Sequence, residues 1–171
     1  MSAREGGETN AQRRQALRVG SELPAVARAT STVQIFRYSA ATWNTHRIHY
    51  DKDYAVAEGY PGVLVQSHLH GAFLAQYCTD WAGDAGRLLE LGLRVARFAL
   101  AGETLTIAGT VSAVERITET RAAISLELTE TRGSDGETCA TGAARVAIPS
   151  SWLANSVAAG PADARAGKTA G

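Results

Sequence analysis

Small or apolar residues alternate with polar ones through much of the second half of the chain. Over 105–113 they fall at every second position, with mostly threonine and serine between them, and 122–128 repeats the pattern. A period of two turns one face of a strand toward a core, so we predict strands over both segments. Turn-forming residues crowd 132–136. They predict an antiparallel hairpin that returns through 138–148.

The middle of the chain follows a different period. Over 62–81 the apolar residues fall largely at three- and four-residue spacings, which predicts a long helix with a broad apolar surface. Pro61 and Gly62 suit its entry and Gly83 lies near its end. A further strand is expected over 91–100. One long apolar helix followed by antiparallel strands is an α+β arrangement, in which a strongly curved sheet can wrap the helix.

Length and composition indicate one folded domain. The chain has 171 residues, and its two ends are polar or rich in small residues, with little to bury. We therefore expect a domain over 16–153, with disordered tails at 1–15 and 154–171.

Charge and cysteine content exclude several classes of function. Seventeen basic residues balance seventeen acidic ones, so the chain lacks the basic surplus of a nucleic-acid binder. The two cysteines form no CxxC pair, which argues against a zinc site and fits a reducing cytoplasm. No apolar run approaches the roughly 20 residues that span a bilayer, and the first residues form no apolar leader. We expect a cytoplasmic protein that does not engage a membrane.

Two short segments resemble motifs of one enzyme family. Residues 44–51 read Asn-Thr-His-Arg-Ile-His-Tyr-Asp, and 59–62 read Gly-Tyr-Pro-Gly. The first is similar to the hydratase motif of MaoC-like hydratases and dehydratases, in the variant of mesaconyl- and itaconyl-CoA-type hydratases. The second resembles the family's loop before its central helix, and the likeness extends over about residues 18–150.

This resemblance implies a fold and a reaction. The fold is a single hotdog, a long central helix wrapped by a curved antiparallel sheet, in a dimer whose sheets join. The reaction is reversible addition of water to a 2-enoyl thioester carried by CoA or an acyl-carrier protein. It needs a base, an acid and hydrogen-bond donors for an enolate oxygen, but no cofactor. Backbone amides at the helix start, near 63–67, are expected to supply the donors.

Three polar residues of the motif are the expected catalytic groups. His49 is the principal acid/base, since an imidazole exchanges protons near neutrality; a structural histidine in a turn is the alternative. Asn44 stands where the wider family has aspartate, and an amide can orient water but cannot act as a base. His46 is either a second proton-handling group or an exposed neighbour of the site.

The remaining motif residues have two readings each. Asp51 could orient an imidazole or cap a short helix over 52–57. Arg47 could bind a substrate carboxylate or a CoA phosphate, or form an ion pair. Gln66 and Ser67 replace the family's His-Gly pair at the helix start, and both can donate hydrogen bonds to a substrate. The expected substrate-binding residues are thus Arg47, Gly62, Val63, Val65, Gln66 and Ser67.

His68 and His70 do not predict a metal site. Histidines two positions apart point in different directions on a helix, and no carboxylates lie at a suitable spacing. Metal ligands and cofactors are therefore not expected.

Two other functions compete with a self-sufficient hydratase. At Asn44, Gln66 and Ser67 the chain differs from the family's usual residues, which would suit a catalytically incomplete subunit that works with a second MaoC-like chain. A homodimer and a heterodimer are therefore both possible. An acyl thioesterase would need a carboxylate facing the thioester from the helix. Asp80 lies too far along the helix for that role.

Overall fold

The computed structural model describes residues 16–154. Its main elements are β1 (Glu22–Ala29), α2 (Thr32–Thr42), α3 (Lys52–Ala57), α4 (Ser67–Ala82), β2 (Arg87–Val95), β3 (Thr104–Arg116), β4 (Arg121–Arg132) and β5 (Thr138–Pro149). Short 3-10 turns cover Arg47–His49, Gly83–Ala85 and Ser150–Trp152. The expected tails lie outside the described residues, apart from Ala154.

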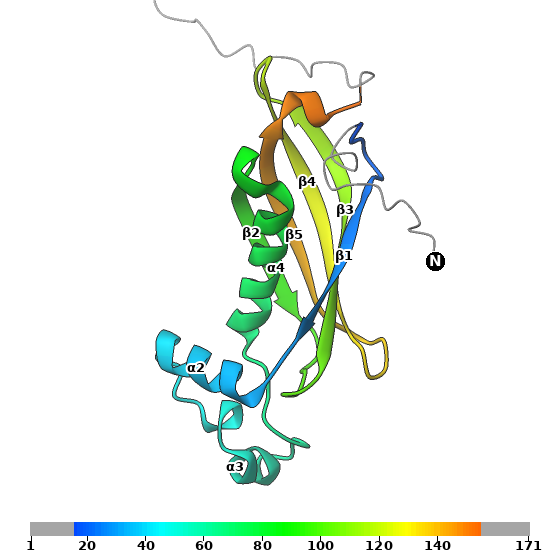
Figure 1. Cartoon of the computed structure of the whole chain (residues 1–171). Helices are drawn as coiled ribbons and strands as arrows, with labels where there is room; N and C mark the ends of the chain where they lie inside the picture. The colour runs from blue at the N-terminus through cyan, green and yellow to red at the C-terminus, as the bar shows by residue number, and fades with distance from the viewer. Residues whose placement is uncertain (1–15, 155–171) are drawn as a thin grey trace, which may run out of the picture.

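One antiparallel sheet, in the order β1-β3-β4-β5-β2, curves around α4 (Figure 1). This is the α+β hotdog arrangement that the sequence predicted. Helices α2 and α3 lie beyond one end of the sheet, near the first turn of α4 (Figure 1). No helix in the described part of the chain is both long and apolar enough to cross a bilayer.

The core lies between α4 and the concave face of the sheet. Leu74 and Cys78 of the helix are fully buried, and the sheet contributes residues such as Ile124. A Cβ atom at Gly109 of β3 would lie 3.1 Å from the Tyr77 ring. The missing side chain therefore lets the helix approach the sheet closely at this point.

The strands predicted over 105–113, 122–128 and 138–148 are confirmed as parts of β3, β4 and β5. The short helix over 52–57 is confirmed as α3. The long helix was predicted to begin near residue 62, which is wrong, because α4 begins at Ser67. The preceding residues pair with the chain after β2: Leu64 bridges Leu100, and the Val65 amide donates to the Ala99 carbonyl at 2.9 Å.

The strand expected over 91–100 lies earlier, at Arg87–Val95. Two elements were not predicted. In β1, Pro24 falls at a register shift in an edge strand, which hides the alternating pattern. In α2, only Ile35 and Ser39 are buried, so no broad apolar stripe marks the helix.

Strand β2 ends the sheet with an open edge. Within the part of the chain that the structure describes, β5 is its only paired neighbour. Leu89 and Leu93 of β2 are each 42% exposed. An unpaired edge that carries exposed leucines is suited to pairing with another sheet.

A buried polar pair joins α4 to β4. His70 Nδ1 and Glu130 Oε1 form a short hydrogen bond, and both side chains are shielded almost completely from solvent. Nε2 of His70 and Oε2 of Glu130 have no partner in the described structure. Removing one member of such a pair leaves the other buried and without its partner.

We predict that His70→Leu lowers the free energy of unfolding by about 3–5 kcal/mol, because Glu130 loses its partner. The double variant His70→Leu/Glu130→Leu should lose less, since neither polar group remains. Urea unfolding of the three proteins measures both differences. A double variant less stable than His70→Leu would contradict this account.

Candidate active site

The motif loop begins where α2 ends. Trp43 has a φ of 55°, a left-handed conformation that stops the helix and turns the chain. The Asn44 amide then donates to the Ser39 carbonyl at 2.9 Å. Oδ1 of Asn44 accepts from the backbone amide of His46 at 3.2 Å. Two of the three predicted catalytic residues therefore share one tight turn.

His49, the third, lies at the end of the 3-10 turn and is 9% exposed. Its Nδ1 lies 2.9 Å from the carbonyl oxygen of Leu64. The Leu64 amide donates to the Ile48 carbonyl at 3.0 Å, so two hydrogen bonds join the motif loop to the segment before α4. Since a carbonyl oxygen only accepts, Nδ1 carries the proton in this bond. In the neutral ring the lone pair is then on Nε2, because the one hydrogen bond that the His49 side chain makes within the described residues uses Nδ1.

The surroundings of His49 favour its neutral form. Burial lowers its pKa below the usual 6.5, the hydrogen bond to Leu64 opposes this, and the charge of His46 lowers the pKa further. The two imidazole centroids are 6.0 Å apart. At neutral pH His49 therefore presents a free lone pair at Nε2, as a general base requires.

Asp51 serves as a helix cap. Its Oδ1 accepts from the Tyr54 amide at 3.0 Å, and its Oδ2 lies 2.6 Å from Nη2 of Arg47. The Arg47 guanidinium also lies over the Tyr54 ring at 4.5 Å. Of the two readings for each residue, the structure has the cap and the ion pair. The side chain of Arg47 stays 56% exposed beside the motif, and its role in binding substrate stays a prediction.

The segment expected to bind the thioester leads into α4. Gly62 is half-buried, and Val63 and Val65 are buried. The Leu64 and Val65 amides donate to backbone carbonyls, so they are not free for a substrate. The amides of Ser67 and His68 open the helix and have no carbonyl one turn earlier to receive them. The free donors thus lie slightly later than expected, and Ser67 is exposed.

Gln66 is fully buried, and both hydrogens of its side-chain amide are engaged within the fold. Nε2 donates to the Ile35 carbonyl at 2.8 Å and to Ser39 Oγ at 2.7 Å. Its donor group therefore holds α2 against the start of α4. The remaining atom, Oε1, has no partner in the described structure.

The other polar residues of α4 point elsewhere. His68 is exposed whereas His70 is buried against Glu130, so the two histidines diverge as expected. Over residues 16–154 no three His, Cys, Asp or Glu side chains gather in a way that could hold a metal ion. Asp80 forms an ion pair with Arg28 at 2.8 Å near the far end of the helix.

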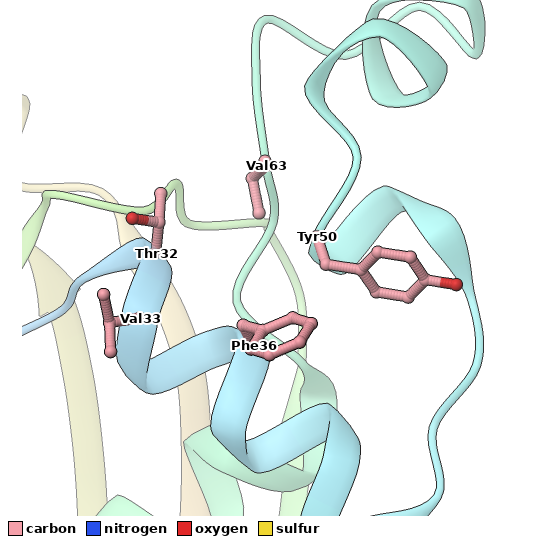
Figure 2. Close-up of a pocket in the computed structure, with 5 residues that line it drawn as sticks. All are labelled: Thr32, Val33, Phe36, Tyr50 and Val63. Atoms are coloured by element: carbon pink, nitrogen blue, oxygen red, sulfur yellow. The ribbon is translucent and has the colours of Figure 1, made fainter.

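An apolar pocket of about 270 Å³ lies next to the motif loop, and the sequence did not predict it. Figure 2 shows its wall on α2 and its opposite side on the loop segments. Its lining residues are Thr32, Val33, Phe36, Tyr50 and Val63. The only signal in the sequence is a pair of large apolar residues at 33 and 36, which without the fold cannot be told from core positions.

The family model described as hydroxyacyl-thioester dehydratase type 2 matches residues 4–100. The chain belongs to the type 2 hydroxyacyl-thioester dehydratase family. It is similar to the 3-oxo-4,17-pregnadiene-20-carboxyl-CoA hydratase beta subunit of Mycobacterium tuberculosis, with 32% identity over 56% of this chain and 74% of the relative. It is also similar to mesaconyl-C(4)-CoA hydratase of Chloroflexus aurantiacus. That match has 51% identity over 25% of this chain and 15% of the relative.

Solved structures of similar proteins share the fold. The ChsH1-ChsH2 complex from Mycobacterium tuberculosis superposes with a TM-score of 0.66 at 25% identity, over 76% of this chain and 97% of the matched one. The (R)-hydratase from A. caviae gives a TM-score of 0.67 at 19% identity, over 79% and 99%. The resemblance to MaoC-like hydratases that the motifs indicated is confirmed.

We predict that His49 titrates below pH 6.5, and that His46→Gln raises its midpoint, because the charge that disfavours a second imidazolium is gone. Proton-detected NMR of histidine-labelled protein measures both midpoints. His68→Gln, which removes an exposed histidine outside this pair, should leave the His49 midpoint unchanged. A midpoint at or above 6.5 in the parent protein would show that burial does not govern this imidazole.

Proposed function

We propose that this chain catalyses the reversible addition of water to the double bond of a 2-enoyl thioester. One observation carries the proposal: His49, in the family's motif, is buried, neutral and donates from Nδ1 to Leu64, with Nε2 unpartnered among the described residues. Asn44, His46 and the first turn of α4 complete the site.

In hydration, Nε2 of His49 removes a proton from water as the water oxygen bonds to C3. The electron pair of the double bond moves toward C2 and the thioester, giving an enolate whose oxygen takes up the charge. The imidazolium then returns its proton to C2, so the product gains one water and His49 is regenerated. Dehydration is the same path in reverse. The steps involve only proton transfer and a shift of electron pairs, and they require neither a metal nor a redox cofactor.

Backbone amides of α4 are the proposed donors to the enolate oxygen. The amides of Ser67 and His68 are free of the helix ladder, and the helix dipole favours negative charge at this end. Oδ1 of Asn44 already accepts from His46, so its Nδ2 is the group that can orient the water. His46 tunes His49 through its charge.

The proposed substrate is a CoA thioester or an acyl-carrier-protein thioester. Arg47, at the exposed rim, would meet the phosphates of the carrier, and Gly62, Val63 and Val65, in the segment before α4, would line the approach to His49. Arg47 is paired with Asp51, and this pairing weakens its attraction for a phosphate. We therefore expect Arg47 to contribute only modestly to substrate binding.

Two free thiols, Cys78 and Cys139, suit the reducing cytoplasm where we propose that the enzyme acts.

A partnered subunit is the second candidate. One similar protein is named a beta subunit, and one similar structure is a complex of two chains. The open edge of β2 offers a surface for joining a second hotdog, either a copy of this chain or a different chain. A thioesterase is the weakest candidate, because Asp80 is paired with Arg28 at the distal end of α4.

We predict that the purified protein depletes the enoyl-thioester absorbance of short, branched or aromatic 2-enoyl-CoA substrates. His49→Ala should lower kcat at least 10²-fold, the usual contribution of a positioned acid/base. Since the pKa of His49 is lowered, kcat/KM should fall only below pH 6.5, as the imidazole becomes protonated.

Ile117→Ala is the matched control. It shortens an exposed side chain in the turn between β3 and β4, so its activity should equal that of the parent protein. A folded protein without turnover on any substrate would refute the self-sufficient hydratase and favour the partnered subunit. Turnover that survives His49→Ala would refute the role of His49.

A further inference from the structure

The apolar pocket beside the motif loop is the feature that the proposed reaction does not yet use. Val33 and Phe36 of α2 line it, although they are 65% and 57% exposed. The neighbouring Ile35 is fully buried in the core, which fixes the rotation of α2 and turns Phe36 outward. Large apolar side chains gathered at a hollow of the surface indicate a binding site.

Two walls of this pocket belong to the segments that hold His49. Tyr50 directly follows His49, and Val63 directly precedes Leu64, whose carbonyl binds the imidazole. The rings of Phe36 and Tyr50 meet edge to face, with centroids 6.4 Å apart. Figure 2 shows Phe36 extending from α2, with Val63 and Tyr50 on the two loop segments that face this helix. The pocket therefore lies beside the two chain segments that carry and orient His49.

The size and chemistry of the pocket select the part of the ligand that it can hold. A volume of about 270 Å³ is below the roughly 300–1,000 Å³ of sites that enclose a whole ligand. None of its five lining residues is charged, and only Thr32 and Tyr50 carry hydroxyl groups. Such a lining suits neither phosphates nor a carboxylate, but it suits a hydrocarbon.

The wall formed by α2 is held in place before any ligand binds. Gln66, at the start of α4, donates to both Ile35 and Ser39 of this helix. Ser31 caps the first turn by accepting from the Gln34 amide at 3.1 Å. A preformed wall allows a bound chain to gain contacts without the cost of ordering a loop.

We propose that this pocket receives the hydrocarbon end of the acyl group, and that Val33 and Phe36 determine which chains the enzyme accepts. The inference rests on the proposed function, because it assumes a thioester at His49. It assigns to the protein a preference for acyl chains longer than four carbons or bearing an apolar branch or ring.

Val33→Phe tests the proposal by filling the pocket. Selectivity is the ratio of kcat/KM for 2-octenoyl-CoA to that for crotonyl-CoA, and we expect it to fall at least tenfold, as when a hydrophobic pocket loses room for a few methylenes. Phe36→Ala should shift the same ratio toward bulkier chains. Val56→Phe is the matched control, since it makes the same change at a 52% exposed valine on α3, outside the pocket lining.

Calorimetry with octanoyl-CoA, butanoyl-CoA and free CoA separates this inference from the reaction. Val33→Phe should weaken octanoyl-CoA binding at least tenfold and leave the other two unchanged, and Val56→Phe should change none. This pattern would support the pocket even if no hydration were detected, in which case only the proposed function fails. If Val33→Phe weakened the binding of all three ligands equally, the pocket would hold the CoA arm instead. If Val33→Phe weakened none of them, the pocket would have no role in acyl binding. Either result overturns the proposal. Thermal melting of each variant confirms that it is folded.

Discussion

The burial of α4 within the curved sheet is the constraint on which the remaining structure depends. Leu74 and Cys78 lose all contact with water, and Gly109 allows the sheet to close against Tyr77. These contacts fix the helix axis, so its first turn always emerges at the same end of the sheet. The open amides of Ser67 and His68 are therefore held in position by packing that lies several turns away.

The site then forms where two loops meet this end of the helix. The protonation pattern of His49 depends on both loops. The motif loop contributes the imidazole, and the segment before α4 contributes the Leu64 carbonyl that binds its Nδ1. Burial and the carbonyl act together: burial keeps the ring neutral, and the carbonyl selects the nitrogen that carries the proton. The catalytic state that we propose is thus a property of the tertiary contact.

Much of the fold could be predicted from the sequence, since strand and helix periods persist through β3, β4, β5 and α4. The start of α4 could not, because the apolar run continues into Val63–Val65, where pairing with Ala99 and Leu100 overrides helix propensity. The motif predicted His49 and Asn44 as catalytic residues, but which backbone and side-chain donors are free depends on long-range hydrogen bonds. Gln66 illustrates this limit: its amide reaches back 27 and 31 residues, a contact that no local pattern encodes.

The residues that attach α2 to the fold are different from the residues that α2 turns toward the pocket. This helix is anchored by Ile35 and by the side chain of Gln66, and the face that it turns to the pocket takes no part in the core. Because this face lies outside the core, substitutions on it should change the free energy of unfolding little, and under our proposal they would change which acyl chain is bound. If the pocket binds the acyl chain as we propose, the range of substrates can change at these exposed positions without stabilising substitutions elsewhere in the chain.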